Sequence, residues 1–460
     1  MNNKWLARNP GFYKTLFLIA GPLILQNALS VSVGFADNIM VGQLGETSVA
    51  GVLVANQLQN IMQLLVAGGI ASSLILLAAQ YWGKRDIESV KAVVAVAVKV
   101  ALAVGLLASI AVLYSPASVL RIFTNDEYVI AEGVLYIRIV AISYVFFCLT
   151  QILMASMRCV EVVRIAVLVS LSTLIISVAL NYLLIFGNFG FPALGIRGAA
   201  IATLTARIIE TVIMVVYVRF VDRRLKIRFV ELIKTDRQLL ADFFRYGTPI
   251  MLGDMLWGIA GSAQIAILGR MGEAALAANS ISMVMFQVTT VVIWSISGAS
   301  AVIIGKTVGS GDYELVKRYA RSLQVVFLSV SLVTAGIILG FRDVFISFYY
   351  FTDETRIIAR QFMTIMGLSI VFTGYHAPCF TGIIRAGGDV KFVLIVDAIC
   401  AWLLVLPSAF LAAFIFDMPP WVVFLCLRSD QFYKWIIAFI KTNRFKWIIN
   451  LTRDGKAYEL

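Results

Sequence analysis

Long, uninterrupted apolar segments fill most of this chain, and short stretches with glycine, proline or charged residues separate them. A helix that crosses the hydrocarbon core of a bilayer needs about 20 apolar residues, whereas strands of a transmembrane barrel alternate apolar and polar residues over ~10 positions. The continuous runs therefore predict an all-α polytopic membrane protein. We expect twelve transmembrane helices, at residues 15–39, 50–80, 92–115, 129–154, 163–187, 196–219, 245–268, 277–305, 319–341, 357–383, 391–416 and 419–440.

The composition narrows the range of functions. Of 460 residues, 60% are hydrophobic and 14% are charged, whereas soluble domains carry about 25% charged residues, so a water-soluble enzyme is excluded. A single histidine, His376, cannot supply a zinc or iron cluster. The five scattered cysteines have neither metal-site nor disulfide spacing. We therefore expect no enzymatic activity and no cofactor.

The formal net charge is +12, and its distribution indicates the topology. Basic residues collect at the start of the chain (Lys4, Arg8), in every second loop, in residues 220–244 and in the tail 441–460. Basic loops of membrane proteins lie on the cytoplasmic side, so the charge reflects topology and not a nucleic-acid partner. We expect a multi-pass protein of the cell (plasma or inner) membrane with both termini in the cytoplasm.

An internal repeat relates the two halves of the sequence. Pro22 and Pro249 are 227 positions apart, each inside the first helix of its half, and are the candidates for helix bending. At the same offset Arg158 matches Arg385, and other matches keep their order. Because each half has six spans, the copies share one orientation, which is a parallel repeat. We expect six-helix lobes at 1–219 and 245–440, joined by the basic linker 220–244, with a cavity between them. Such a repeat indicates a transporter with alternating access.

Several short motifs carry a family resemblance. Gly21-Pro22 is followed by Asp37 and by Gly42-x-x-Gly45, and the paired segments FTND (123–126) and FTDE (351–354) recur in the two halves. Further motifs are NYLLIFG (181–187), LGIRGAAIAT (194–203) and IIRAGGD (383–389). In this order they resemble the multidrug and toxic compound extrusion (MATE) family, and within it the DinF-like branch. The resemblance implies a twelve-helix antiporter that exports amphipathic, often cationic compounds in exchange for protons or sodium.

Asp37 is the strongest candidate for ion coupling. An ionisable side chain at mid-membrane costs ~2.5–3.5 kcal/mol on insertion scales, and the repeat partner of Asp37 is the neutral Gln264. A desolvated carboxylate can exchange a proton for a cationic ligand. Asn181 and Thr203 are expected to offer oxygens toward Asp37, with Ser177 one turn before Asn181, as a proton or Na⁺ site. The alternatives are a helix end near the outer surface for Asp37 and ordinary interhelical hydrogen bonds for the others.

The resemblance also marks a departure at this site. Some DinF-like members carry an asparagine and an aspartate one turn apart on the fifth helix, where this chain has Ser177 and Asn181. The first lobe thus has one carboxylate fewer, which weakens the case for sodium.

In the second lobe, Asp254, Gln264 and His376 are candidates for a polar cavity. The alternatives are pairing of Asp254 with a neighbouring helix and a local hydrogen bond for His376. Arg207 and Glu210, at i and i+3 on one helix, predict an ion pair.

Three function classes are open to a helical membrane protein of this kind: an exporter, a flippase and a membrane-embedded enzyme. An exporter of small amphipathic or cationic molecules, monomeric in the bilayer, fits the carboxylate of Asp37. A flippase for lipid-linked oligosaccharide precursors is the alternative, and it needs several arginines around a pyrophosphate. The intramembrane arginines Arg138, Arg207 and Arg428 lie on three different helices. A membrane-embedded enzyme needs a catalytic constellation that one histidine does not supply.

Overall fold

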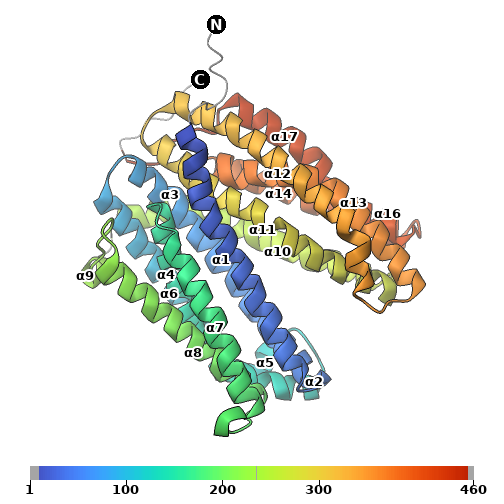
Figure 1. Cartoon of the computed structure of the whole chain (residues 1–460). Coiled ribbons are helices and arrows are strands. Elements are labelled where there is room, and N and C mark those ends of the chain that lie inside the picture. The colour runs from blue at the N-terminus through green and yellow to red at the C-terminus, as the bar shows by residue number, and fades with distance from the viewer. Residues whose placement is uncertain (1–9, 235, 454–460) are drawn as a thin grey trace. The chain divides into compact units, whose positions relative to one another are not determined.

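The computed structural model describes residues 10–234 and 236–453. The predicted basic residues Lys4 and Arg8 and the end of the tail, 454–460, lie outside this range. Within it the regular secondary structure is helical (Figure 1), apart from an isolated antiparallel bridge between Gly388 and Ile448. The fold is therefore all-α, as the apolar pattern predicts.

The helices of the first half are α1 (Pro10–Gly42), α2 (Glu46–Met62), η1 (Gln63–Ile70), α3 (Ala71–Gly83), α4 (Ile87–Tyr114), α5 (Pro116–Leu120), α6 (Glu127–Cys159), α7 (Arg164–Phe186), η2 (Asn188–Gly190), α8 (Ile196–Val216), η3 (Tyr217–Val221) and α9 (Phe229–Ile233). Those of the second half are α10 (Arg237–Gly269), α11 (Glu273–Gly309), α12 (Tyr313–Ser347), α13 (Asp353–Pro378), η4 (Cys379–Arg385), α14 (Val390–Ala398), η5 (Ile399–Val405), α15 (Leu406–Phe414), α16 (Pro420–Leu427) and α17 (Asp430–Arg444). Short π-helical segments (η1, η3, η4 and η5) continue the neighbouring α-helices, so several elements form one span.

Eleven helical segments of the described residues are long and apolar enough to cross a membrane, and they correspond to the first eleven predicted spans. The twelfth predicted span, 419–440, is also helical, but it is not one continuous helix. The chain there forms two helices, α16 and α17, with the break at Arg428 and Ser429. After the break, α17 carries the polar residues Asp430, Gln431 and Lys434, which are buried in contacts described below.

Backbone geometry repeats between the two halves. Gly45 precedes α2 with φ 109° and ψ 164°, and Gly272 precedes α11 with φ 116° and ψ 165°. Positive φ of this size is accessible to glycine and strained for other residues. Asp86 caps α4 by accepting from the Ser89 N–H, as Asp312 caps α12. The parallel repeat of the sequence is thus also a structural repeat.

By internal contacts the chain divides into two compact units. Unit 1 comprises Met1–Ile24, Ala79–Arg85 and Leu252–Leu460, and unit 2 comprises Leu25–Ala78 and Asp86–Met251. Helices α1 and α10 each belong to both units and change unit two residues after Pro22 and Pro249. Proline removes one helical hydrogen bond at such a point, and the bending role of both prolines stays a prediction.

The units do not follow the predicted lobe boundaries. Of the predicted linker 220–244, only residues 222–236 lie between η3 and α10, and α9 interrupts them. Residues 237–244 form the start of α10, and the predicted tail 441–460 begins with the last turn of α17.

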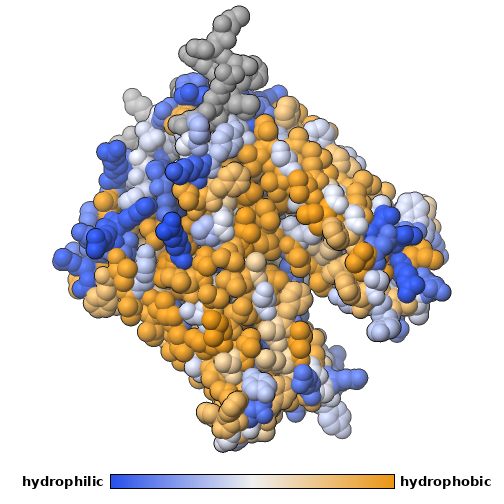
Figure 2. Space-filling view, viewed as in Figure 1, coloured by the Kyte–Doolittle hydropathy of each residue, from blue (hydrophilic) through white to orange (hydrophobic). Residues whose placement is uncertain are grey.

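Each unit has its own apolar core. In unit 1, Phe362 of α13 stacks on Phe424 of α16 with ring centroids 4.1 Å apart, inside a cluster that includes Ile281 and Met366. In unit 2, α4 and α6 pack closely, with Val94 and Ile137 fully buried. Figure 2 shows apolar side chains over most of the visible helical surface, with hydrophilic ones gathered near helix ends. Large exposed apolar surfaces of this kind are stable in contact with lipid.

Candidate functional site

Asp37 lies in the half of α1 that belongs to unit 2, facing α7. Its Oδ1 accepts hydrogen bonds from the Ser177 hydroxyl at 3.0 Å and from the Asn181 side-chain amide at 2.6 Å. Ser177 and Asn181 are four residues apart, so they lie on one helical face, and both are almost completely buried. Two donors from α7 therefore hold one carboxylate of α1.

A second polar group of unit 2 lies within electrostatic reach of Asp37. Arg207 and Glu210 of α8 form an ion pair at 2.9 Å, which confirms the prediction from their spacing. Glu210 also accepts from the Thr173 hydroxyl at 2.6 Å. Electrostatic interactions connect Arg207 and the buried Tyr136 of α6 to Asp37. The carboxylate thus shares its apolar surroundings with a guanidinium whose charge Glu210 already balances.

Thr203 does not hydrogen-bond Asp37 among the described residues, because its hydroxyl donates to the Ala199 carbonyl at 3.0 Å. A different oxygen is available beside the carboxylate. Asn181 Oδ1 is buried and has no hydrogen-bond partner in the described part of the chain, although buried polar atoms are nearly always paired. A carboxylate next to an unsatisfied amide oxygen and a hydroxyl suits a proton or a small hard cation, which prefers oxygen ligands.

The three candidates in the second half of the chain are not brought together. Asp254 of α10 pairs with Arg385 of η4 at 3.1 Å, the pairing alternative considered for it. His376 of α13 contacts Gln431 of α17 through Nε2 at 2.6 Å, and the Gln264 side chain forms no hydrogen bond with another described residue. Unit 1 therefore has separate polar contacts where the sequence suggested one cavity.

Unit 1 also contains a buried ionic network that was not predicted from the sequence. The Lys434 ammonium contacts Asp397 Oδ1 and Asp430 Oδ2, each at 2.9 Å. Gln431 donates to Asp430 at 2.6 Å and so connects the network to His376. Asp430 and Lys434 are four residues apart, a spacing that predicts a pair on a helix, so the sequence does carry a signal for this network.

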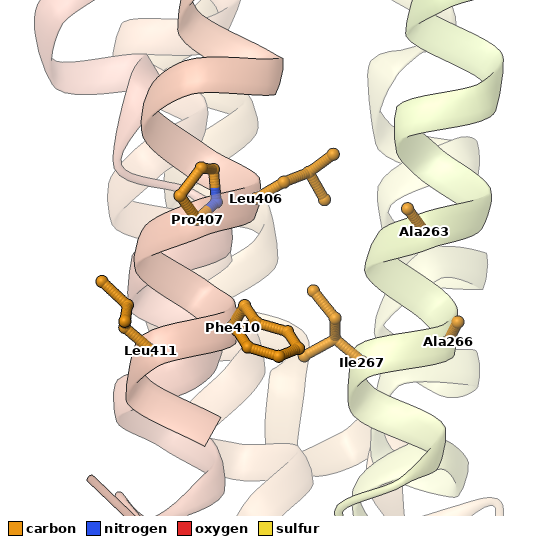
Figure 3. Close-up of a pocket in the computed structure, with 7 residues that line it drawn as sticks. All are labelled: Ala263, Ala266, Ile267, Leu406, Pro407, Phe410 and Leu411. Carbon is orange, nitrogen blue, oxygen red and sulfur yellow. The ribbon is translucent and has the colours of Figure 1, made fainter. Parts of the chain in front are cut away.

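The internal repeat identifies the unit 1 residues that correspond to the Asp37 cluster of unit 2, by which we mean Asp37, Ser177 and Asn181. At the offset of 227, Asp37, Ser177 and Asn181 correspond to Gln264, Leu404 and Ser408. Next to these positions an apolar cavity of about 510 Å³ opens between α10 and α15, and Ile267 and Phe410 point toward each other across it (Figure 3). Its lining residues are Ala263, Ala266, Ile267, Leu406, Pro407, Phe410 and Leu411. The Asp37 cluster is thus present in the first copy of the repeat and has no counterpart with a carboxylate at the matching positions of the second copy.

The intramembrane arginines do not converge on one anion site. Arg207 is paired with Glu210, Arg138 is exposed, and Arg428 lies over the rings of Phe286 and Phe424. A pyrophosphate needs several guanidinium groups around one point.

Apolar spans, a structural repeat and a half-buried intramembrane carboxylate held by two donors define a membrane transporter of the two-repeat helical type. The MatE family model matches residues 22–183 and 249–411, one match in each half, beginning at the two repeat prolines. The chain therefore belongs to the MatE (MATE) family.

Known proteins similar to this chain agree in class. It is 26% identical over 426 residues to the probable multidrug resistance protein NorM of Rhizobium meliloti (strain 1021), covering 91% of this chain and 88% of that protein. It is 26% identical to the probable multidrug resistance protein YoeA of Bacillus subtilis (strain 168), with 87% of each chain covered. Among solved structures, the outward-facing conformation of a multidrug resistance MATE family transporter superposes with a TM-score of 0.83 at 17% identity, covering 96% of this chain and 99% of that one. That similarity shows the twelve-helix MATE fold.

Proposed function

We propose that this protein is a secondary active antiporter that exports small amphipathic, often cationic compounds in exchange for protons or sodium. The observation that carries the proposal is the half-buried Asp37 carboxylate, held by the buried side chains of Ser177 and Asn181. The relatives named as probable multidrug resistance proteins support the substrate class. The topology proposed with it places both termini in the cytoplasm, and the functional unit is the monomer.

Asp37 is the group whose charge changes in this mechanism. Without a coupling ion the carboxylate is negative, and the donors of Ser177 and Asn181 stabilise it. When a proton or Na⁺ binds, the negative charge is neutralised and the Asn181 amide loses its charged acceptor. The hydrogen bonds that join α1 to α7 then weaken, because bonds to a charged acceptor are roughly twice as strong as neutral ones. This changes the packing of α1 and drives the alternation of access.

The oxygen atoms around Asp37 that are free to bind an ion decide whether a proton or Na⁺ is the coupling ion. Asn181 Oδ1 has no partner among the described residues, whereas the Thr203 hydroxyl is already bonded to its own helix. Within the described part of the chain, Asp37 supplies the only carboxylate hydrogen-bonded to Ser177 and Asn181. A Na⁺ ion would use Asp37 and the oxygens of Asn181 and Ser177, and a proton needs Asp37 alone.

The test is transport in liposomes that contain purified protein and a fluorescent amphipathic cation. Dye movement is followed after a proton gradient and, separately, a sodium gradient is imposed. We expect transport under one of the two gradients, and an Asp37→Asn variant that inserts and folds but transports at least 100-fold more slowly. The matched control is Asp353→Asn, whose side chain is 95% exposed and which should transport like wild type. Wild-type rates in Asp37→Asn under the active gradient would overturn the proposal.

A further inference from the structure

The last described residues of the chain, 445–453, are docked and mostly buried. After α17, Phe445 adopts φ 58° and the chain turns back and continues without a helix over residues 445–453. Trp447 is completely buried, and its indole N–H donates to the Thr442 carbonyl at 2.8 Å. Ile448 and Leu451 are also buried. We call residues 445–453 the terminal strap.

One side of the strap fits against the segment that follows η4. The Ile449 N–H donates to the Gly387 carbonyl at 2.7 Å, and Ile448 forms the isolated bridge with Gly388. The Trp447 ring lies directly over Gly387, where an added Cβ would come within 2.1 Å of it. Gly388 has φ +111°, a conformation that favours glycine. Gly387 and Gly388 of the IIRAGGD motif therefore form the surface on which the strap docks, which we call its seat.

The other side of the strap holds the last turn of α3. Gln80 is fully buried and its Oε1 accepts from the Leu451 N–H at 2.7 Å. Its amide group donates at 3.4 Å to the carbonyls of Ile449 and of Ala386. Lys84 donates to the Arg453 carbonyl at 2.8 Å. Gln80 thus joins α3, the strap and the η4 segment at one point.

The same turn of α3 packs against the end of α11 by reciprocal glycine contacts. A Cβ on Gly83 would lie 1.9 Å from the Lys306 carbonyl oxygen, and one on Gly309 would lie 1.8 Å from that of Gln80. Gly83 and Gly309 are repeat partners at an offset of 226. The repeated ends of α3 and α11 therefore meet backbone to backbone, as small residues permit between membrane helices.

All these contacts lie inside unit 1, but α3 itself continues into unit 2 from Ala78 backwards. The strap consequently fixes the end of a helix whose remainder belongs to the other unit. In the proposed topology this end is cytoplasmic.

We propose that the terminal strap is a latch that keeps the ends of α3 and α11 in contact, and that it must release Gln80 before the transporter opens to the cytoplasm. The proposal rests on the proposed function for its consequence in transport, but the docking and its effect on α3 are testable without transport.

The experiment is hydrogen exchange with mass spectrometry on the purified full-length protein, read at residues 79–85, 305–311 and 446–453. Gly387→Ala places a methyl group against Trp447 and should displace the strap, raising exchange at least tenfold in all three segments. Gln80→Ala leaves the seat of the strap intact and should raise exchange in 79–85 and 305–311, and within the strap only at the Leu451 amide, which loses its acceptor. The control is Gly336→Ala in α12, where an added Cβ meets nothing within 4 Å, and it should change none of them.

Faster exchange of the strap in Gly387→Ala, with 79–85 and 305–311 still protected as in wild type, would overturn the latch. So would unchanged exchange in Gln80→Ala. In the liposome assay both variants should lower the KM for substrate on the cytoplasmic side at least threefold, because more molecules are open to it. Failure of wild-type transport under both gradients would count against the proposed function, whereas the exchange result judges the latch separately.

Discussion

Replacing Lys434 by methionine tests whether the ionic network of unit 1 stabilises the fold. The Lys434 side chain is 5% exposed, and those of Asp430 and Asp397 are 11% and 28% exposed. Methionine has similar length and no charge, so the substitution leaves the buried Asp430 side chain with the Gln431 amide as its hydrogen-bond partner. Asp397 loses less, because water reaches it.

The expected cost follows from the buried carboxylate. Removing one partner of a buried ion pair costs ~3–5 kcal/mol, since the other charge stays without compensation. In a chain of this length, about 1–2 °C of melting temperature corresponds to each kcal/mol, so we expect Tm to fall by at least ~3 °C. The measurement is thermal unfolding of the detergent-purified protein.

Two further variants separate charge burial from loss of packing. Lys434→Met combined with Asp430→Asn should regain part of the lost stability, because the uncompensated charge is removed. Arg121→Met breaks a surface pair with side chains 57% and 69% exposed and should cost at most ~1 kcal/mol. A Tm of Lys434→Met within about 1 °C of wild type, or a double variant less stable than the single one, would refute the reasoning.

Two other predictions concern the backbone and the linker. Gly45→Ala should lower the free energy of unfolding by ~1–2 kcal/mol because the φ of Gly45 is +109°. Gly42→Ala should not, because Gly42 has no positive φ; an added Cβ meets no atom within 4 Å at either position, so only backbone strain separates the two variants. Equal Tm values of the two variants would contradict this. Burial raises the pKa of Glu231, but hydrogen bonds from the Arg228 N–H and from Lys91 outweigh it and hold that pKa below its usual range. The Glu231 carboxylate therefore stabilises the linker fully above pH ~4.3, the ordinary pKa of glutamate. This stabilisation is lost as the pH falls through the lowered pKa of Glu231. An acid protease should cut residues 222–236 faster at pH 3 than at pH 5 in wild type, and equally fast at both in Glu231→Gln.

Local properties of the chain could be predicted from the sequence. A span needs only a sufficient run of apolar residues, and eleven such runs are helices. The i, i+3 spacing of Arg207 and Glu210 sufficed for their ion pair, since a helix alone brings them together. The twelfth span is helical in two parts, and the apolar pattern did not predict that its polar residues Asp430, Gln431 and Lys434 are buried by partners elsewhere in unit 1.

The candidate site was predictable only in part. An intramembrane carboxylate without a charged repeat partner is visible in the sequence, and the fifth predicted helix was the expected source of its neighbours. Which hydroxyl faces Asp37 was not predictable: Ser177 does, whereas Thr203 bonds to its own helix. Helix rotation decides this, and it depends on the packing of every neighbour.

By itself the sequence determined the membrane class, the positions of eleven spans, the repeat and the family resemblance. Each of these depends only on local composition, on short motifs, or on residues that recur at a fixed distance along the chain. Only the tertiary structure decided that Ser177, and not Thr203, donates to Asp37, and only it decided the Lys434 network and the docking of the terminal strap on Gln80. These contacts join residues up to 371 positions apart. Buried polar groups must find partners wherever the packing brings them, and no local pattern specifies which partner that is.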